Sequence, residues 1–424
     1  MNYYSSLKEF ELRNLYAQLG ESPNPILARV DINVPVKKDS RKISRNPYNL
    51  RLEYYAYELD LYSTFAPVVV MAHQGRNDGK DINFVDLNNH IHALGVLTNN
   101  ANILYEPGVK GENYFGKRLI KRIKSLDVGD VLVLKNVREF DFETKFDPNN
   151  CPYIPFFKKA GIEACINNGL PLYHRAHSSV MALPHIAPTY IGLISAKELE
   201  IQHKILHDDG KKIVIMGGKK PKAKTVPNLA KSMDIMVGGL TGQIFCRLKG
   251  FDLGPKNNQE VEKQLSSYKP EEINMLKEVV RKYEIITPID FVVSFNGEIK
   301  EVSIDDLPGK PYYIEDIGPQ TVDLQVSKIR EGGYDWIIRG GPEGRYEAEH
   351  YNGIKVVRKI LGRGFVALGG DTIEELQTAK LCKPIVATGG QMLLGGGAHL
   401  SGWAGEPYPS LDEILKIQTT NVGR

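Results

Sequence analysis

The chain has 424 residues, of which 42% are hydrophobic and 25% are charged, and its formal net charge is +3. These values are typical of a soluble globular protein, and the length favours two domains over one core. The mild charge and the lack of a basic–aromatic stripe argue against a nucleic-acid partner. Four cysteines without a CxxC pair favour a reducing cytoplasm over a disulfide framework or metal cluster. No signal-peptide pattern opens the sequence, and no apolar run approaches the roughly 20 residues of a membrane span.

The first predicted strand, Ile26–Val36, alternates apolar and polar residues, so that Arg29, Asp31 and Asn33 share one face. Three polar side chains on one strand face are costly to bury unless they bind one another or a ligand. The segment therefore predicts either an internal Arg–Asp pair or a ligand-binding edge.

Later strands of the N-terminal half end in basic or amide side chains. In chain order we predict a loop over 37–49, a helix opening at Arg51, a strand over 66–73 that ends at His73-Gln74-Gly75-Arg76, a helix around 84–97, a strand near 103–105, a strand over 130–138 that ends at Asn136 and Arg138, and a weaker strand over 161–168 that leads to His174, Arg175 and His177. Ligands bind at the carboxyl edge of open parallel α/β sheets. A lone His or Arg would be an ordinary surface residue, but their convergence suits a small ligand with several negative oxygens.

A predicted helix over Ile191–Leu206 connects this half to a second one, in which the strands end in glycines instead of arginines. The predicted pairs are Gly217-Gly218 after Lys212–Met216, Gly238-Gly239 after DIMV, Gly340-Gly341 after DWIIR, Gly369-Gly370 after GFVAL and Gly389-Gly390 after PIVAT, with Gly318-Pro319 after YIEDI as a related end. We expect a second doubly wound sheet whose loops admit a bulky ligand close to the backbone, with residues 297–310 as an exposed excursion.

Four lysines, Lys219, Lys220, Lys222 and Lys224, follow the first glycine pair. A buried strand, a glycine turn and clustered cations indicate a place to hold phosphate. The alternative is a solvated lysine loop.

Three further features of this half could serve a nucleotide. Gly389-Gly390, which we expect to precede a helix, could offer N–H groups to a phosphate or form an ordinary turn. Asp371 suits a magnesium ion shared with phosphate oxygens, or the N-cap of a helix. Glu347 could accept hydrogen bonds from ribose hydroxyls or start a helix.

Neither a P-loop motif nor the protein-kinase motifs occur in the sequence. One predicted half-site thus suits a small polyanion and the other a nucleotide phosphate tail. A kinase on a scaffold of two lobes fits this combination best.

At these positions the chain resembles phosphoglycerate kinase of the archaeal type. The motifs that carry the resemblance, in the family's order from about residue 26 to 400, are RVDINVP at Arg29–Pro35, AHQGR at Ala72–Arg76, NVR at Asn136–Arg138, HRAHSS at His174–Ser179, KELEIQHKIL at 197–206, GGKKPKAK at Gly217–Lys224, DIGPQT at Asp316–Thr321, GPEGRYE at Gly341–Glu347, GGDT at Gly369–Thr372 and TGG at Thr388–Gly390. The resemblance implies an α/β fold of two doubly wound, Rossmann-like parallel-sheet domains joined by an interdomain helix and a hinge. The N-terminal domain would span 1–190, the helix 191–207 and the nucleotide domain 208–404, with a tail over 405–424 returning towards the N-terminal domain.

The resemblance also implies roles for single residues. Arg51 and Lys220 would be catalytic, since Arg51 would stabilise charge on the moving phosphoryl group and Lys220 would follow that group. The residues implied to hold 3-phosphoglycerate are Asp31, Asn33, Arg51, His73, Arg76, Arg138, His174 and Arg175. The residues implied to form the nucleotide site are Gly217, Gly218, Lys220, Lys224, Gly238, Gly239, Pro342, Glu347, Gly370, Asp371, Thr372, Gly389 and Gly390, with Asp371 holding Mg²⁺.

The implied reaction is reversible phosphoryl transfer between 1,3-bisphosphoglycerate and ADP, giving 3-phosphoglycerate and ATP. It needs positioning and charge neutralisation, and a domain closure that excludes water. The implied enzyme is a cytoplasmic monomer that uses Mg²⁺ and binds neither nucleic acid nor membrane.

Several positions depart from the family pattern. Gly340 replaces an Asn, Gln391 and Met392 replace small residues of TGGGA, Ala223 replaces an Asp, and Asn168 with Pro171-Leu172-Tyr173 alters the loop before HRAH. These departures leave two alternatives open: a kinase of the same fold with another carboxylate acceptor, and a binding protein without transfer. Retention of Arg51, Lys220 and Asp371 argues against the second, because a pure binder gains little from groups that serve a transition state.

Overall fold

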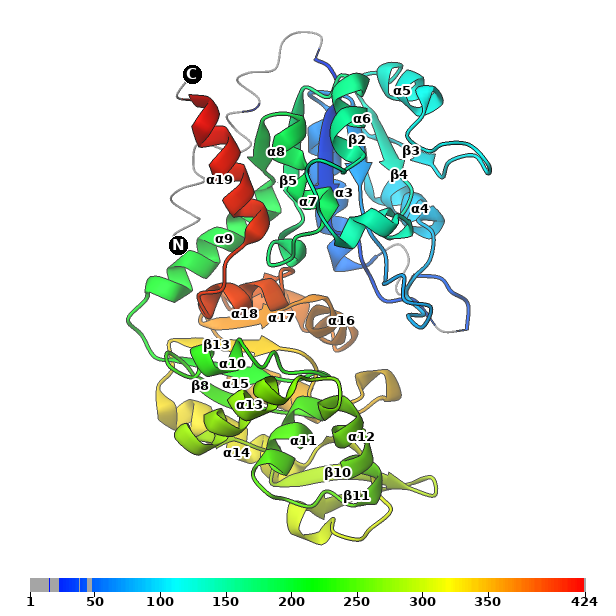
Figure 1. Ribbon diagram of the computed structural model, residues 1–424. Coiled ribbons are helices and arrows are strands. Elements are labelled where there is room, and N and C mark those ends of the chain that lie inside the picture. The colour runs from blue at the N-terminus through cyan, green and yellow to red at the C-terminus, as the bar shows by residue number, and fades with distance from the viewer. Residues whose placement is uncertain (1–14, 16–22, 38, 44–47, 423–424) are drawn as a thin grey trace. The chain divides into compact units, whose positions relative to one another are not determined.

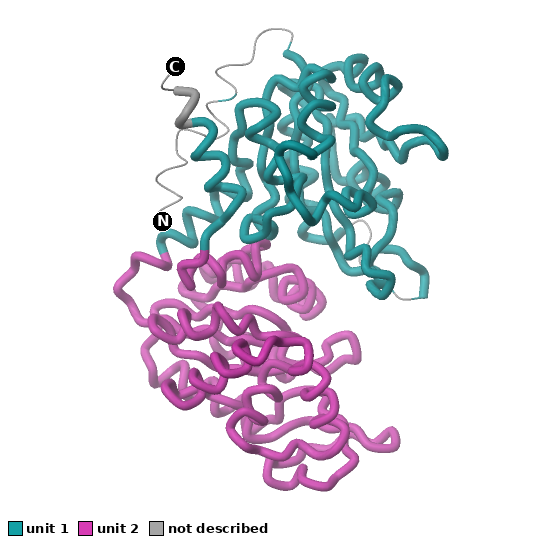
Figure 2. Tube along the Cα trace, in the orientation of Figure 1, with its two compact units in different colours: residues 1–204, 407–424 teal, residues 205–406 magenta. Residues whose placement is uncertain are grey.

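The computed structural model describes Leu15 and residues 23–37, 39–43 and 48–422. Part of the loop predicted over 37–49, and all but Leu15 of the first 22 residues, lie outside the described residues. The chain forms two compact units, unit 1 from Met1–Lys204 with Pro407–Arg424, and unit 2 from Ile205–Glu406 (Figure 2). None of the described helices is long and apolar enough to cross a membrane.

Unit 1 is built on a six-stranded parallel sheet in the order β3-β4-β2-β1-β5-β6. Its strands are β1 Ile26–Val30, β2 Val68–Met71, β3 Asn102–Glu106, β4 Asp130–Leu134, β5 Ala164–Asn168 and β6 Thr189–Ile191. The chain builds outward from β1 on one side, then returns to add β5 and β6 on the other. Ligands bind at such a switch in strand order, here between the carboxyl ends of β1 and β5.

Helices cover both faces of this sheet, as Figure 1 shows. They are α3 Leu50–Ser63, α4 Asn88–Leu97, α5 Lys117–Lys124, α6 Tyr153–Ala160, α7 Ser178–Met181, α8 Leu183–Ile186, α9 Leu193–His207 and α19 Pro409–Val422, with 3-10 turns η2 Val137–Glu139, η3 Asp141–Thr144 and η4 Leu170–Leu172. The Asn49 side chain caps α3 by accepting a hydrogen bond from the Arg51 N–H, which places Arg51 in the first turn. The predicted first strand is shorter than expected: β1 ends at Val30, and Asp31 and Asn33 lie in the loop after it.

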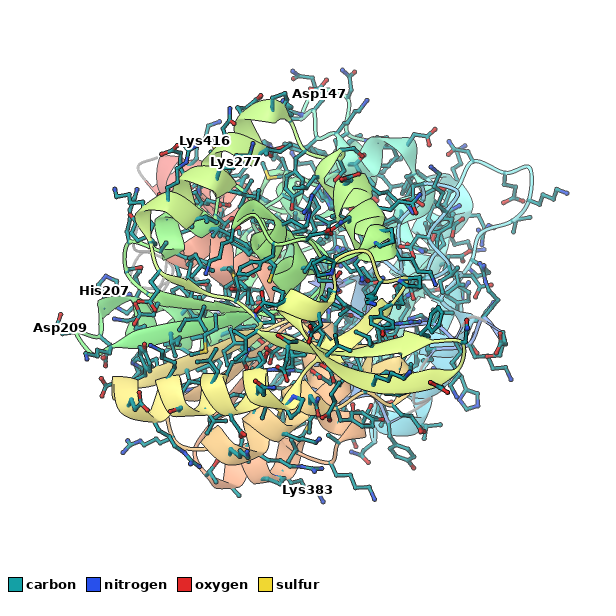
Figure 3. The ribbon with its side chains drawn as sticks, turned by 90° about the horizontal axis from the view of Figure 1, so that it is seen from below. Asp147, His207, Asp209, Lys277, Lys383 and Lys416 are labelled. Carbon is teal, nitrogen blue, oxygen red and sulfur yellow. The ribbon has the colours of Figure 1, made fainter. Side chains whose placement is uncertain are left out.

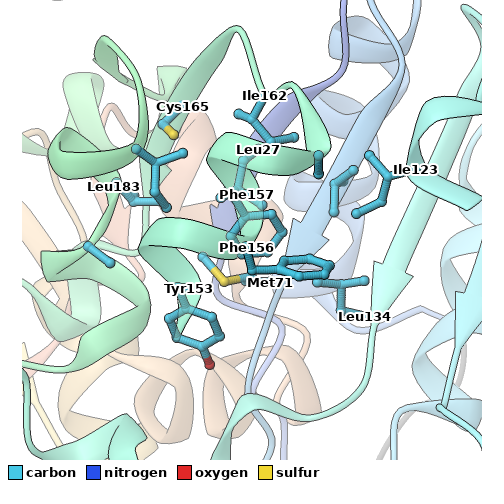
Figure 4. Packing of buried hydrophobic residues seen from close by; sticks show 14 of the residues in the cluster. Leu27, Met71, Ile123, Leu134, Tyr153, Phe156, Phe157, Ile162, Cys165 and Leu183 are labelled. Carbon is cyan, nitrogen blue, oxygen red and sulfur yellow. The ribbon is translucent and has the colours of Figure 1, made fainter. Parts of the chain in front are cut away.

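The core of unit 1 lies between this sheet and α5, α6 and α8. Figure 4 shows Leu27 and Met71 from the sheet, with Phe156 and Phe157 of α6 in the same cluster. All five β1 residues are buried, as expected for a central strand with helices on both faces. Such a strand reads as a continuous apolar run, and Arg29 is the exception in β1.

The C-terminal helix α19 packs on unit 1. His185 Nε2 lies 2.8 Å from Glu413 Oε1, and the Thr189 N–H donates to Gln418 Oε1 at 2.8 Å. Just before α19, the Tyr408 hydroxyl donates to Gln202 Oε1 on α9 at 2.8 Å. The tail after residue 406 is therefore part of the N-terminal fold.

Unit 2 has a second six-stranded parallel sheet, in the order β15-β14-β13-β7-β8-β9. Its strands are β7 Lys212–Met216, β8 Asp234–Val237, β9 Ile285–Ile286, β13 Trp336–Gly340, β14 Phe365–Leu368 and β15 Gln391–Leu393. The strand order switches between β7 and β13. The two-domain doubly wound α/β fold expected from the sequence is confirmed.

Two local predictions in this half are wrong, and a third is incomplete. YIEDI forms β12 Tyr313–Ile317, which belongs to a separate antiparallel sheet with β10 Asp290–Phe295 and β11 Glu298–Ser303. The excursion predicted over 297–310 is exposed over most of its length, as expected, but it contains β11, which pairs with β10 as a hairpin. PIVAT is not a strand but lies in helix α17 Cys382–Ala387 and its C-cap, because a short apolar run does not distinguish the two structures.

The helices of unit 2 carry charged side chains on their outer faces; Figure 3 shows Lys277 and Lys383 pointing away from the ribbon. The described helices of this unit are α10 Val226–Leu229, α11 Gly239–Leu248, α12 Pro255–Leu265, α13 Pro270–Lys282, α14 Pro319–Gly332, α15 Asn352–Ile360, α16 Gly370–Thr378, α17 Cys382–Ala387 and α18 Gly397–Trp403. Two 3-10 turns, η5 Ile304–Asp306 and η6 Tyr346–Ala348, accompany them.

The unit 1 core gives a stability prediction. Phe157→Ala should lower the free energy of unfolding by about 3–5 kcal/mol, because it deletes a fully buried ring and leaves a cavity. Urea unfolding followed by circular dichroism would measure it. Tyr57→Ala removes a ring that is 70% exposed and is the control, expected to change stability by less than about 0.5 kcal/mol. Equal losses in the two variants would contradict the assignment of Phe157 to the core.

Candidate functional site

The carboxyl edge of the unit 1 sheet gathers charged and polar side chains at the switch between β1 and β5. The Arg51 guanidinium at the start of α3 forms an ion pair with Asp31, and both side chains are buried. His73 Nδ1 lies 3.9 Å from the second Asp31 oxygen. That oxygen also accepts the Asn33 N–H at 3.2 Å, which holds the loop after β1.

Arg29 lies at the centre of this edge, although its site role was not predicted from the sequence. It is fully buried, its Nε donates to Ser179 Oγ at 2.8 Å, and its Nη2 lies 3.0 Å from His73 Nδ1. Its Nη1 donates to the Val30 carbonyl. The partners with which Arg29 makes hydrogen bonds are thus neutral, and its main charged partner is the carboxyl group of Glu143, which lies beyond Ser179.

A buried acid, Glu143, binds Ser179, which is the hydrogen-bond partner of Arg29 Nε. Its Oε1 accepts from Ser179 Oγ at 2.7 Å and its Oε2 from the Ser179 N–H at 3.0 Å. His177 Nδ1 is 4.0 Å from Glu143 Oε1. Burial raises the pKa of Glu143 to about 7, against the opposing pull of Arg29 and Arg138. The sequence carries no clear signal for this residue, which is one of three acids, with Glu139 and Asp141, in the five positions after the NVR motif.

The two buried histidines of the cluster are neutral at pH 7. Burial, then the charge of Arg29, lowers the pKa of His73 well below its usual value. Burial, then Arg138, lowers the pKa of His177 to about 3. Because Arg29 can only donate, His73 Nδ1 is the acceptor and its Nε2 carries the proton. His73 is therefore a neutral hydrogen-bond donor in a cationic site.

The predicted substrate residues divide into a buried centre and an exposed rim. Asp31, Arg51, His73 and Arg138 are buried, and Arg138 Nε has no acceptor within the part of the chain that the structure describes. A buried cationic N–H without an acceptor fits an anion as its partner. Burial lowers the pKa of Arg138 to about 10, and the charges of Arg175 and Arg76 contribute in the same direction.

The residues at the rim either bind backbone groups or are exposed to solvent. Asn33 Oδ1 accepts the Gly75 N–H at 2.8 Å, which pins the loop that carries the exposed Arg76. Arg175 is exposed, and its Nε donates to His174 Nε2 at 3.2 Å. These side chains stand at the mouth of the site, while the buried set forms its floor.

The loop over 168–173, which suggested another acceptor, is directed into the fold. The Asn168 side chain binds Glu58 of α3 and the start of α9. The Tyr173 hydroxyl donates to the Asn167 carbonyl at 2.8 Å, and Leu172 packs with Val180 and Met181. These substitutions are thus explained by packing.

In unit 2, the glycine loops pack against one another at the switch between β7 and β13. The Gly217 N–H donates to the Gly340 carbonyl at 2.9 Å and the Gly218 N–H to the Pro342 carbonyl at 2.7 Å. The Gly239 N–H donates to the Glu343 carbonyl at 2.9 Å, and a Cβ on Gly238 would lie 2.6 Å from Glu343 Cγ. Close loop packing therefore requires these glycines, and their N–H groups already have acceptors.

A second buried arginine, Arg339, lies next to these loops in strand β13. Arg339 of β13 is fully buried and donates to both oxygens of Glu375, at 2.6 and 3.0 Å. Its Nε lies 3.7 Å from Glu343 Oε2, and Gln325 Nε2 donates to Glu343 Oε1 at 2.7 Å. The sequence did not predict this network, because Gln325 of α14 and Glu375 of α16 are far in the chain from Arg339 and Glu343.

The lysines of the loop after β7 do not point one way. Lys220 is exposed, donates to Ser267 Oγ at 2.8 Å and lies 4.1 Å from the centre of the Tyr268 ring. Lys222 turns to α18, where it donates to the Gly397 carbonyl at 2.8 Å and to Ser401 Oγ at 3.0 Å. Lys224 is exposed.

Gly389 and Gly390 do not precede a helix, so the predicted helix-start site is wrong. They follow α17 and lead into strand β15, and their N–H groups donate to Val386 and Ile385 carbonyls at 3.0 and 2.9 Å. They therefore lie at the amino edge of the sheet, opposite the other glycine pairs. Glycines do lie at the carboxyl end of β15, at residues 395–397 before α18. Gln391 and Met392 are strand residues, so they do not replace the small residues of a loop.

Asp371 and Glu347 are the acids predicted to face a nucleotide. Asp371 is exposed in the first turn of α16, whose N-cap is Gly369, so it does not cap the helix. The Thr372 hydroxyl accepts the Gly341 N–H at 2.7 Å, which joins the start of α16 to the loop after β13. Glu347 is exposed within η6. No group of three or more acidic, His or Cys side chains in the described ranges could hold a metal unaided.

Comparisons with known proteins agree with this architecture. The sequence model of the family described as "Phosphoglycerate kinase" matches residues 19–406. A curated phosphoglycerate kinase from Pyrococcus furiosus is 30% identical over 431 residues, which cover 97% of each chain.

The structural matches agree with the sequence matches. The crystal structure of phosphoglycerate kinase from Pyrococcus horikoshii superposes with a TM-score of 0.79 at 27% identity, covering 97% of this chain and 99% of that one. The phosphoglycerate kinase structure from Coxiella burnetii, with a TM-score of 0.61 at 20% identity, covers 94% and 98% of the two chains and shares the fold. The chain therefore belongs to the phosphoglycerate kinase family.

Proposed function

We propose that this chain catalyses reversible phosphoryl transfer between 1,3-bisphosphoglycerate and ADP, giving 3-phosphoglycerate and ATP. The observation that carries the proposal is the buried cationic floor of unit 1, in which Arg29, Arg51 and Arg138 lie beside two neutral histidines. Such a floor suits a ligand with phosphate and carboxylate oxygens. The relatives reported above are phosphoglycerate kinases, which supports the same reaction.

The site contains cations and N–H donors rather than a base paired with a nucleophile, and the reaction explains why. In the direction of ATP consumption the nucleophile is the substrate carboxylate, which is ionised at pH 7 and needs no general base. Its oxygen attacks the γ-phosphorus, the bond to the β-phosphate oxygen breaks, and ADP leaves. Catalysis then rests on positioning and on neutralising charge.

We assign unit 1 to the phosphoglycerate and unit 2 to the nucleotide. In unit 1, Asp31 orients Arg51, and a bound anion competes for the same guanidinium. Arg51 would stabilise charge on the moving phosphoryl group, with Arg138 and the His73 Nε2–H as further donors and Asn33, Arg76, His174 and Arg175 at the rim. Transfer requires closure of the two units around the substrates and exclusion of water.

In unit 2, Lys220 would leave Ser267 to follow the phosphoryl group, at little cost because its contacts there are exposed. Lys224 would hold nucleotide phosphate. The glycine loops would offer their α-carbon faces to the nucleotide, with Pro342, Glu347, Gly370 and Thr372 around it. Gly389 and Gly390 have no part in this proposal.

The reaction calls for Mg²⁺ on the nucleotide phosphates, and Asp371 fits that ion. Mg²⁺ is held in proteins by one or two carboxylates together with phosphate oxygens and water, and Asp371 is one exposed carboxylate at a carboxyl edge. When bound, the ion would neutralise phosphate charge. We further expect a cytoplasmic monomer, a setting that suits a chain with four cysteines, three of them buried.

Lys220→Ala should lower kcat by about 100-fold or more, because one cation that follows the transferring group is lost. The measurement is ATP formation from ADP and enzymatically generated 1,3-bisphosphoglycerate. Lys219→Ala, the exposed neighbour, is the matched control and should stay within about twofold of the wild type. A folded wild-type protein that binds nucleotide but forms no ATP would overturn the proposed function itself.

Asp371→Asn should raise the Mg²⁺ concentration that gives half-maximal activity by about tenfold, since the amide is a weaker ligand for this ion. A magnesium titration at fixed ADP measures it. Asp305→Asn removes an exposed carboxylate from η5 and serves as the control. An unchanged magnesium requirement in Asp371→Asn would remove Asp371 from the metal site.

His177 gives a prediction on pH. The unfolded imidazole takes a proton near pH 6.5, whereas the folded one remains neutral down to about pH 3. The stability that this neutral group contributes is therefore present above pH 6.5 and is lost as the pH falls. The free energy of unfolding of the wild type, relative to His177→Gln, should fall by about 1.4 kcal/mol per pH unit between pH 6 and 4.

Denaturant unfolding at each pH measures this difference. His92→Gln removes an exposed imidazole from α4 and tests whether the loss of any histidine gives the same slope. A flat difference between the wild type and His177→Gln would mean that His177 is protonated in the folded protein.

A further inference from the structure

Helix α9 is the segment in which the chain passes from unit 1 into unit 2, since the boundary between the units falls after Lys204. The first N–H groups of a helix have no partner within it. In α9, the Ile194 N–H donates to Glu58 Oε1, and the Ser195 N–H donates to Asn168 Oδ1 at 3.1 Å. Two side chains from outside the helix thus cap its first turn.

Glu58 and Asn168 also bind each other. Asn168 Nδ2 donates to Glu58 Oε2, which accepts from the Tyr62 hydroxyl as well. Glu58 is only 1% exposed and Asn168 is fully buried. Each polar group thus has one defined role: the carboxylate accepts throughout, and the amide donates to Glu58 and accepts from α9.

The segments around this pair pack closely. The Gly192 N–H donates to the Asn167 carbonyl at 3.2 Å, and a Cβ on Gly192 would collide with the Asn168 side chain. The Tyr55 hydroxyl donates to the Asn168 carbonyl at 2.9 Å. The end of β5, the start of α9 and the middle of α3 are therefore joined at one buried point.

Helix α3 connects the Glu58–Asn168 pair to the buried cationic floor of unit 1. Arg51 and Glu58 lie seven residues apart, two turns along one face of α3, and both are buried. Arg51 binds Asp31 in the floor, and Glu58 binds the first turn of α9. The element that places Arg51 thus also fixes where α9 begins.

We propose that Glu58 and Asn168 are positioning residues for phosphoryl transfer, which fix the first turn of α9 to the helix that carries Arg51. The proposal rests on the proposed function for its catalytic part. Neither residue touches the substrate; each acts through α9. The pair differs from an ordinary helix cap because its donor and acceptor are complementary and can be exchanged.

The exchange is the test. Asn168→Asp sets two carboxyl groups face to face and removes the amide donor. Burial raises the pKa of Glu58 to about 7, so both readouts are taken at pH 8, where two facing carboxylates repel. In Glu58→Gln, the new side-chain oxygen can accept the Ile194 N–H. The new amide N–H then faces the N–H of Asn168, and neither of these two groups has an acceptor in the other. The double variant Glu58→Gln/Asn168→Asp restores one donor and one acceptor, and leaves an oxygen for each N–H of α9.

Two readouts are measured on the full chain. Amide hydrogen exchange of peptides spanning 193–200 reports the first turn of α9, and the coupled assay reports kcat and KM. Asn168→Asp should speed exchange and lower kcat, each by about tenfold, with the KM for 3-phosphoglycerate within about twofold. The double variant should return both values to within about threefold of the wild type. Glu200→Gln, an exposed acid on α9 that pairs with Lys197, is the control and should change neither.

The outcomes separate the two parts of the proposal. Faster exchange with a wild-type kcat in Asn168→Asp would overturn the positioning role. A double variant as impaired as the single one on both readouts would overturn the pairing of Glu58 with Asn168. A wild-type protein without transfer activity would remove the proposed function and the positioning role with it, while the exchange data would still decide whether the pair fixes α9.

Discussion

The structure of unit 1 depends on one buried guanidinium. Arg29 replaces an apolar residue in the central strand, and a charge there is tolerated only if its N–H groups have acceptors. The acceptors are Ser179, His73 and the Val30 carbonyl, and the nearest support for Ser179 is Glu143. Because Arg29 donates to His73, the imidazole is neutral and its other nitrogen must donate. Arg29, at the centre of the sheet, therefore fixes the positions of the side chains around it in the buried cationic floor.

Unit 2 also has a buried arginine in its parallel sheet, but the partners of this arginine are charged. Arg339 is as deeply buried as Arg29, and it too lies in a strand beside the switch in strand order. Its partners are carboxylates, since Glu375 binds it through both oxygens and Glu343 lies beside it. Carboxylates thus bind Arg339 directly, whereas Arg29 binds neutral groups and has Glu143 beyond Ser179 as its main charged partner. On the loop after β7 of unit 2, Lys219, Lys220 and Lys224 are exposed, whereas Lys222 binds the Gly397 carbonyl and Ser401. A buried cationic floor in unit 1 and exposed lysines in unit 2 suit a bound acid and a travelling phosphoryl group.

The glycine pairs illustrate how one residue type serves two purposes. From sequence, glycines at strand ends indicate a ligand close to the backbone. In the fold, Gly217, Gly218 and Gly239 bring loops close to one another, and their N–H groups bind neighbouring carbonyls. The two uses are compatible, because loops packed without side chains also leave an open surface above them. What the packing excludes is the use of these particular N–H groups as phosphate donors.

The sequence by itself determined the two parallel sheets, the connecting helix and most of the charged residues at the strand ends. These follow from local patterns: apolar runs of strand length, and polar groups directly after them. The sequence could not determine which glycines share an edge, since Gly389-Gly390 follows an apolar run that folds as helix α17 instead of a strand. Nor could it find Glu143, Arg339 or the pairing of Glu58 with Asn168, whose partners are more than 30 positions away. Tertiary structure decided these contacts, because the partner of a buried polar group is set by which elements meet around it and not by its neighbours in the chain.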